Sequence, residues 1–209
     1  MIKEVAIREI QSPTWAITEQ FLQVHSVITN PAELSIGVSE NGSQCQIAYF
    51  PVKDEKFFFA IEVENDESIV AVFSHPFISV ALNMFSKTFN SEQMTSLIDY
   101  IPIKSWNKGD RWNGDSVRVN SKIIIDPNPL PDSFGNKLSK LLEVLQSRAT
   151  EIKAMPNDIE MLIQVTQISH NGNGSIDGLA LSASQLTHLA KLEFAIDFDL
   201  YAEGKSFKD

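Results

Sequence analysis

The residues whose types and spacing best fit a binding site lie between Trp106 and Trp112, in the stretch Trp-Asn-Lys-Gly-Asp-Arg-Trp. The two indoles bracket a glycine turn that also carries Lys108, Asp110 and Arg111. Aromatic rings next to cations suit stacking on a planar ligand, or anchoring a protein interface through a large buried area. The alternative is that one or both indoles close the end of a hydrophobic core. The sequence therefore predicts a binding loop here, with a core-closing turn as the competing interpretation.

A second candidate group is Asp197, Asp199 and Tyr201, which share one face of the alternating stretch 192–201. Paired carboxylates about 7 Å apart along a strand can bind a metal or share acid–base work. Either use needs further ligands or a pocket that shifts a pKa, and the sequence shows neither. We expect a solvated strand face, on which acids also discourage pairing with a foreign strand.

No motif in the sequence predicts a catalytic residue, a metal or a cofactor. The four histidines show no metal-ligand spacing and have no cysteine partner. Gly172-x-Gly174 lacks the other glycines of a nucleotide-binding loop, and Cys45 is expected to lie in a strand rather than to act as a nucleophile. An enzyme whose groups come together from distant positions stays an alternative, because such a site leaves no local pattern.

The formal net charge of −10 argues against nucleic-acid binding, because affinity for phosphate backbones comes largely from Lys and Arg. The charge is uneven: residues 104–122 hold five bases and two acids, whereas residues 33–67 hold eight acids and two bases. An acidic body of this kind steers cationic partners towards it. The sequence therefore predicts a basic protein partner, and the competing interpretation is that the acidic charge only keeps the protein soluble.

The composition also bears on location. No apolar run approaches the roughly 20 residues that span a bilayer, and the first residues lack the long hydrophobic region of a signal peptide. A single cysteine excludes an internal disulfide. We expect a cytoplasmic protein without a membrane partner, and the sequence carries no signal for an oligomeric state.

These candidates depend on an α+β fold in which antiparallel sheets are covered by helices. For residues 1–75 we predict a separate N-terminal unit, a helix packed on a β-meander. It begins with a weakly alternating strand over residues 1–10 and an amphipathic helix that starts at Ser12-Pro13 and ends before Asn30. The meander strands are expected at residues 34–38, 44–50, 57–64 and 68–73, with a tight turn in Glu40-Asn41-Gly42-Ser43.

For residues 76–209 we predict a ferredoxin-like domain with elements in the order β-α-β-β-α-β-α-β. The expected ranges are residues 77–85, 91–98, 101–106, 115–125, 133–155, 159–168, 182–190 and 192–201. The long helix has an inward leucine stripe that leaves Lys137 and Lys140 outside, and Ser182 and Gln185 have capping-box spacing. The stretch 59–64 is similar to 194–199. This similarity indicates either a duplicated unit or a coincidence, because an alternating half-buried strand allows few residue patterns.

Several features in a fixed order carry a resemblance to a known family. They are Phe77-Ile78-Ser79-Val80, the helix at 91–98, Pro102-Ile103-Lys104-Ser105-Trp106-Asn107-Lys108-Gly109-Asp110, the leucine-rich helix, and Leu181-Ser182-x-x-Gln185-Leu186-x-x-Leu189-Ala190 followed by residues 196–201. Through them residues 76–203 resemble the bacterial domain of unknown function 4279 family. The resemblance implies an intracellular bacterial protein with an α+β fold and implies no function.

Charge, size and the missing catalytic motifs favour a non-catalytic protein-interaction module, of which an immunity or antitoxin-like inhibitor is one form. The first alternative is a small-ligand-binding module that uses the tryptophan loop or a groove between the two units. The second is the enzyme with a dispersed site.

Overall fold

The computed structural model describes residues 2–39, 45–173, 176 and 178–206. The chain separates into two compact units. The first comprises Met1–Ile78, Gln167–Gly178 and Leu200–Asp209, and the second comprises Ser79–Thr166 and Leu179–Asp199. Both combine helices with antiparallel strands, so the fold belongs to the α+β class. The turn predicted at Glu40-Asn41-Gly42-Ser43 lies outside the described residues.

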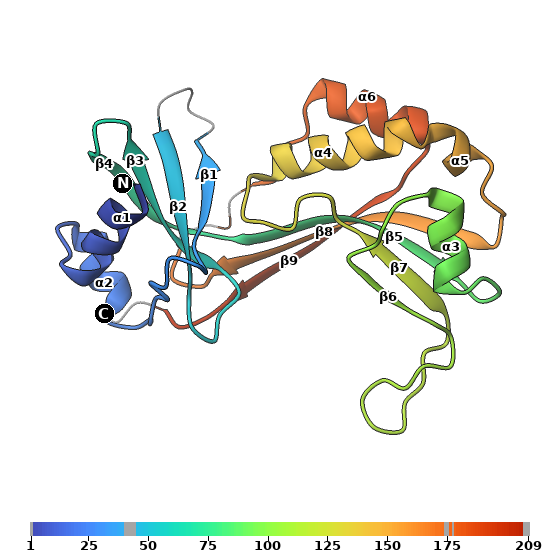
Figure 1. The fold of residues 1–209 in the computed structure, drawn as a ribbon, viewed down its shortest axis with the longest axis horizontal. Coiled ribbons are helices and arrows are strands. Elements are labelled where there is room, and N and C mark those ends of the chain that lie inside the picture. The colour runs from blue at the N-terminus through green and yellow to red at the C-terminus, as the bar shows by residue number, and fades with distance from the viewer. Residues whose placement is uncertain (1, 40–44, 174–175, 177, 207–209) are drawn as a thin grey trace. The chain divides into compact units, whose positions relative to one another are not determined.

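The first unit contains a four-stranded antiparallel sheet in the order β1-β2-β3-β4, which confirms the predicted meander (Figure 1). Its strands are β1 (Ser35–Val38), β2 (Cys45–Pro51), β3 (Phe58–Glu64) and β4 (Ile69–His75). Phe50 of β2 lies directly opposite Phe59 of β3, and both rings are fully buried with Phe21. This aromatic cluster is the centre of the first core.

The helix α1 (Ile2–Gln11) packs on this core, so the strand predicted over residues 1–10 is wrong. Ile2, Val5, Ala6 and Ile10 all contact the core cluster. Their spacing of three, four and eight residues is helical, and it outweighs the weak alternation in the same stretch.

The helix α2 (Ala16–Leu22) is shorter than predicted. Val27 forms a bridge with Val52, and the backbone N–H of Ile28 donates to the carbonyl of Pro51. Pairing with the end of β2 therefore takes the place of two further helical turns.

The second unit contains most of a five-stranded sheet in the order β6-β7-β5-β8-β9, and the start of β5 and the ends of β8 and β9 belong to the first unit. Its strands are β5 (Phe77–Ser86), β6 (Lys104–Trp106), β7 (Ser121–Ile125), β8 (Ile159–His170) and β9 (Ile196–Glu203). The helices are α3 (Ser91–Ile98), α4 (Phe134–Ser147), α5 (Ala149–Lys153) and α6 (Ala183–Leu192). The order of elements is the predicted one, with the long helix divided into α4 and α5. The ferredoxin-like assignment stays a prediction.

The helices α4 and α6 lie on one side of these strands (Figure 1). Phe134 of α4 contacts Phe198 of β9, with ring centroids 6.1 Å apart. On the central strands Met84 and Ile123 lie opposite each other and are fully buried. The side chains that alternate with them, among them Phe85, Lys122 and Ile124, point to the other side of the sheet and are only partly buried; we call this side the open face.

The predicted outward position of Lys137 is wrong, because its side chain is only 1 % exposed. Its ammonium group donates to the backbone carbonyls of Asn128 and Leu130, in the segment that precedes α4. The helical pattern gives the direction of a side chain but not whether a neighbouring segment covers it.

One further expectation needs correction. The strands β6 and β7 are shorter than predicted, and residues 107–120 between them form a long loop (Figure 1).

The similar stretches 59–64 and 194–199 occupy different environments, because β3 is an inner strand and β9 is an edge strand. The structure therefore gives no support for a duplicated unit.

Among the described residues, no helix has the length and apolar content to cross a membrane.

Candidate functional site

The loop between β6 and β7 is a hairpin extension held by its own backbone. The N–H of Gly109 donates to the carbonyl of Arg118 at 2.9 Å, and the N–H of Arg118 returns a bond to the carbonyl of Asp110 at 2.9 Å. Gly109 has a φ of 90°, a conformation that costs a glycine little. The carboxylate of Asp110 accepts from the N–H of Asn107 at 2.7 Å. Asp110 is thus a turn residue, and its role is to fix the loop.

This hairpin places Arg118 between the two tryptophans. The guanidinium carbon of Arg118 lies 4.2 Å from the ring centroid of Trp106 and 4.4 Å from that of Trp112. Both distances are those of cation–π stacking. Trp106 is half-buried, whereas Trp112 is 51 % exposed. We call this arrangement the Trp-Arg-Trp stack.

Lys122 extends the stack across the open face. It lies directly opposite Trp106 on β6 and Phe85 on β5. Its ammonium nitrogen is 4.5 Å from the ring centroid of Phe85 and 5.4 Å from that of Trp106. Burial lowers the pKa of Lys122, and the positive charges of Arg118 and Lys104 lower it further. A row of aromatic and cationic side chains therefore crosses three strands.

The other predicted residues of the loop are placed at its surface. Lys108 and Arg111 are exposed, and the ammonium group of Lys108 reaches the carbonyl of Lys87 at 3.4 Å. The sequence singled out both tryptophans but not Arg118 or Lys122 as site residues. Pairing across a hairpin brings Arg118, twelve residues along the chain, back to Trp106. The only signal in the sequence was that both lie in the base-rich stretch 104–122.

Asp197 and Tyr201 are exposed and Asp199 is half-buried, but these residues are not part of the same group as the loop. They lie on β9, at the opposite edge of the sheet from β6. Asp199 accepts from the amide of Gln164 at 2.6 Å, and the carbonyl oxygen of Gln164 accepts from Asn83 at 2.7 Å. Asp199 therefore ends a polar chain that starts on the central strand β5, and the structure divides the predicted site into two groups.

Two histidines that are far apart in the sequence meet in the first unit. The Nε2 atoms of His25 and His170 are 2.9 Å apart, and the backbone carbonyl of Lys205 lies 3.2 Å and 2.8 Å from them. Burial lowers the pKa of His25 and the adjacent His170 lowers it further, whereas the Lys205 carbonyl and Glu55 act in the opposite direction. Within the described residues, no group of three or more His, Cys, Asp or Glu side chains is arranged to hold a metal.

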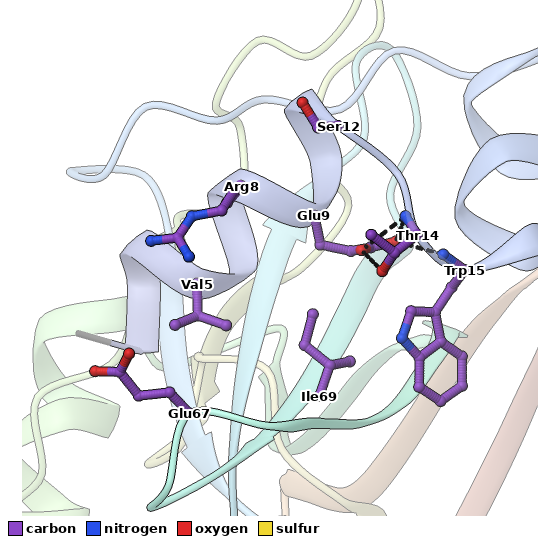
Figure 2. Close-up of a pocket in the computed structure, with 8 residues that line it drawn as sticks. All are labelled: Val5, Arg8, Glu9, Ser12, Thr14, Trp15, Glu67 and Ile69. Carbon is purple, nitrogen blue, oxygen red and sulfur yellow. Dashed lines mark hydrogen bonds between the residues drawn. The ribbon is translucent and has the colours of Figure 1, made fainter.

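A cavity of about 410 Å³ lies between α1, the segment that follows it, and the start of β4 (Figure 2). Val5 and Ile69 supply apolar walls, and the indole of Trp15 supplies an aromatic one. Arg8 and Glu67 lie at the end away from Trp15 (Figure 2). We call this cavity the α1–β4 pocket; no pattern in the sequence singled it out.

Glu9 is 3 % exposed and shapes one side of the α1–β4 pocket. Its carboxylate accepts from the N–H groups of Thr14 and Trp15, at 3.0 and 3.1 Å, and from the Thr14 hydroxyl at 2.6 Å (Figure 2). Burial raises the pKa of Glu9, but the hydrogen bonds from Thr14 and Trp15, with the nearby Thr18 hydroxyl, outweigh it, so the pKa lies below its usual range. The carboxylate is therefore a structural anion that fixes Trp15 in the wall.

Comparison with known proteins identifies a family for most of the chain. A family model described as domain of unknown function (DUF4279) matches residues 75–203. No curated protein and no solved structure matches the chain. The matched range contains the Trp-Arg-Trp stack and the polar chain, and it leaves the α1–β4 pocket outside.

Proposed function

We propose that this chain, which belongs to the DUF4279 family through residues 75–203, is a protein-interaction module. Its binding surface is the Trp-Arg-Trp stack with Lys122, and the bound element is an acidic segment of a partner protein. The observation that carries the proposal is the position of the Arg118 guanidinium between two indoles. A narrower role as an immunity or antitoxin-like inhibitor stays a prediction, as does a cytoplasmic location.

The stack holds Arg118 ready for a carboxylate. Two flanking rings restrict the orientation of the planar guanidinium, so little side-chain entropy is lost when it binds. Within the described part of the chain, no carboxylate forms an ion pair with Arg118 or Lys122. The edge of the guanidinium can thus offer two parallel N–H groups to a partner carboxylate.

The apolar surroundings favour a protein segment over a nucleic acid. Ile103, Val117 and Val119 are all exposed on the hairpin or next to it, together with the half-exposed Trp112. Exposed apolar side chains next to Trp and Arg are typical of the centre of a protein interface. The net charge of −10 also disfavours binding to a phosphate backbone, because affinity for that backbone comes largely from Lys and Arg.

The test is a titration with a synthetic peptide that alternates Glu with apolar residues. Isothermal calorimetry at low salt should show binding to the intact chain, and the fluorescence of Trp112 should change on the same titration. Arg118→Met and Trp112→Ala should each weaken binding about tenfold or more, the effect of losing an interface anchor. Lys191→Met is the matched control, because it removes one exposed positive charge from α6 in the same unit.

Three outcomes would contradict the proposal. One is an effect of Lys191→Met as large as that of Arg118→Met, because binding would then follow net charge alone. Another is tighter binding of a Lys-rich peptide of the same length, which would support the basic partner predicted from the overall charge. The third is tighter binding of a single-stranded oligonucleotide.

A further inference from the structure

We infer that the α1–β4 pocket binds a small zwitterion with an apolar side chain, of the chemical class of the aromatic and aliphatic α-amino acids. It lies in the first unit, outside the family-matched residues 75–203 and separate from the Trp-Arg-Trp stack. Four features of the pocket carry the inference: its size, its apolar walls, its two charges of opposite sign, and the rigid support of its aromatic wall.

The size and walls set the bulk and polarity of the occupant. A volume of about 410 Å³ is at the lower end of the range of small-molecule sites. Val5 and Ile69 both line the cavity, and Trp15 closes one end (Figure 2). An apolar or aromatic side chain placed among these residues would be removed from water and would stack on the indole.

The charges set the polar end of the occupant. Arg8 and Glu67 lie together at the end opposite Trp15 (Figure 2), and both are exposed. Within the described part of the chain, Glu67 forms no hydrogen bond or ion pair, and Arg8 forms none either, although its charge also acts on the carboxylate of Glu4 one turn earlier. An anion would be met by the Arg8 guanidinium and a cation by the Glu67 carboxylate, so one ligand that carries both charges satisfies both groups.

The aromatic wall is held in place by the protein itself. The buried carboxylate of Glu9 binds the N–H groups of both Thr14 and Trp15, so the backbone that carries the indole is fixed before a ligand arrives. Glu9 is therefore a positioning residue, and Arg8 and Glu67 are the groups that contact the ligand.

The experiment compares three ligands of one shape. L-Phenylalanine carries both charges, 3-phenylpropionate lacks the ammonium group, and phenethylamine lacks the carboxylate. Calorimetry on the intact chain should show one site for L-phenylalanine and binding about tenfold or more weaker for each analogue, because each analogue leaves one charged partner unmatched.

Two variants then assign the ends of the pocket. Arg8→Gln should lower the affinity for L-phenylalanine to that for phenethylamine, and Glu67→Gln should lower it to that for 3-phenylpropionate. Lys53→Gln and Glu19→Gln are the matched controls, because both positions are exposed in the same unit and do not line the pocket. The inference is overturned if neither L-phenylalanine nor L-leucine binds, if an analogue binds as tightly as L-phenylalanine, or if the control variants weaken binding as much as Arg8→Gln.

Discussion

Lys137 shows how one residue ties a helix to the segment before it. Its ammonium group is buried against the carbonyls of Asn128 and Leu130, and the carboxylates of Asp126 and Asp132 lie near enough to stabilise its charge. Burial lowers the pKa of Lys137, while the two carboxylates act in the opposite direction. A buried cation of this kind holds the fold by hydrogen bonds whose loss is costly.

Replacing Lys137 by Met should therefore reduce the free energy of unfolding by about 2–4 kcal/mol, because the buried carbonyl of Asn128 and the part-buried carbonyl of Leu130 lose their donor. Methionine keeps most of the apolar stem, so the change isolates the ammonium group. Urea unfolding measures the loss. Lys140→Met is the matched control: Lys140 lies on the same helix, half-exposed and 3.8 Å from Asp132, and a surface pair is worth less than about 1 kcal/mol. Equal losses in the two variants would contradict the structural role of Lys137.

The residues that the sequence could identify are those whose signal is local. Trp106 and Trp112 stand out because two indoles with bases in a short turn are unusual, and the exposed position of Trp112 is compatible with a binding role that stays a prediction. Arg118 and the pair of His25 and His170 carry no such signal. Their neighbours come from other segments of the chain, so only the fold reveals the contacts.

At the scale of the element, α6 illustrates a helix that was predictable from its start. Ser182 accepts from the N–H of Gln185 at 3.2 Å, and Gln185 accepts from the N–H of Ser182 at 2.9 Å, which is the predicted capping box. The amide of Gln185 also donates to the carbonyl of Gly135 and to the hydroxyl of Ser139, both on α4. One side chain therefore starts α6 and fixes it to its neighbour.

Two substitutions separate these roles. Ser182→Ala should lower stability by about 1 kcal/mol, the usual effect of losing an N-cap. Gln185→Ala should lower it by roughly 2–3 kcal/mol, because the bonds to α4 are lost with the cap. Thermal unfolding ranks the variants. Thr187→Ala on the same helix is the control and should be neutral or slightly stabilising, because alanine is the better helix former. A loss for Gln185→Ala no larger than that for Ser182→Ala would argue against the link between α4 and α6.

Elements with a strong pattern were predicted well, and those with a weak pattern were not. The leucine-rich helix buries one clear face, and β2 and β3 are apolar runs bounded by turns, so these patterns decide the structure. Helix α1 is short and has charged residues among its apolar ones, so strand and helix patterns compete until packing on β2 and β3 decides. The strand predicted over residues 115–125 shortens to β7 because the preceding residues turn back into the hairpin.

For the whole molecule, the α+β class and the order of elements followed from the sequence, because both depend on which stretches are apolar and where turns interrupt them. The assignment of residues to each unit did not follow from the sequence. Gln167–Gly178 and Leu200–Asp209 belong with the N-terminal residues, and this return of the chain leaves no mark in composition. The candidate sites divide in the same way, because the Trp-Arg-Trp stack lies within one unit and the α1–β4 pocket within the other.

The lowered pKa values of three groups, His25, Glu9 and Asp132, predict how the stability of the whole molecule depends on pH. The pKa of His25 is lowered below 6.5 in the folded chain. As the pH falls below 6.5, His25 therefore takes up a proton more readily in the unfolded chain than in the folded chain. The pKa of Glu9 is lowered below 4.5 and that of Asp132 below 3.8; burial opposes both shifts, and hydrogen bonds outweigh it. Each group therefore stabilises the fold above its unfolded pKa and loses that contribution as the pH falls through its folded pKa. All three act in the same direction.

We expect the free energy of unfolding to fall in two stages on acidification, the first beginning near pH 6.5 and the second near pH 4.5. Urea unfolding across this range measures both stages. His25→Gln should flatten the first stage and leave the second, because glutamine cannot be protonated there, whereas Glu9→Gln should reduce the second and leave the first. The groups that face His25 are His170, Glu55 and Lys205, so Glu55→Gln should steepen the first stage by removing a charge that favours the protonated form. An unchanged slope between pH 6.5 and 4.5 in His25→Gln would show that the buried histidine pair does not control the first stage.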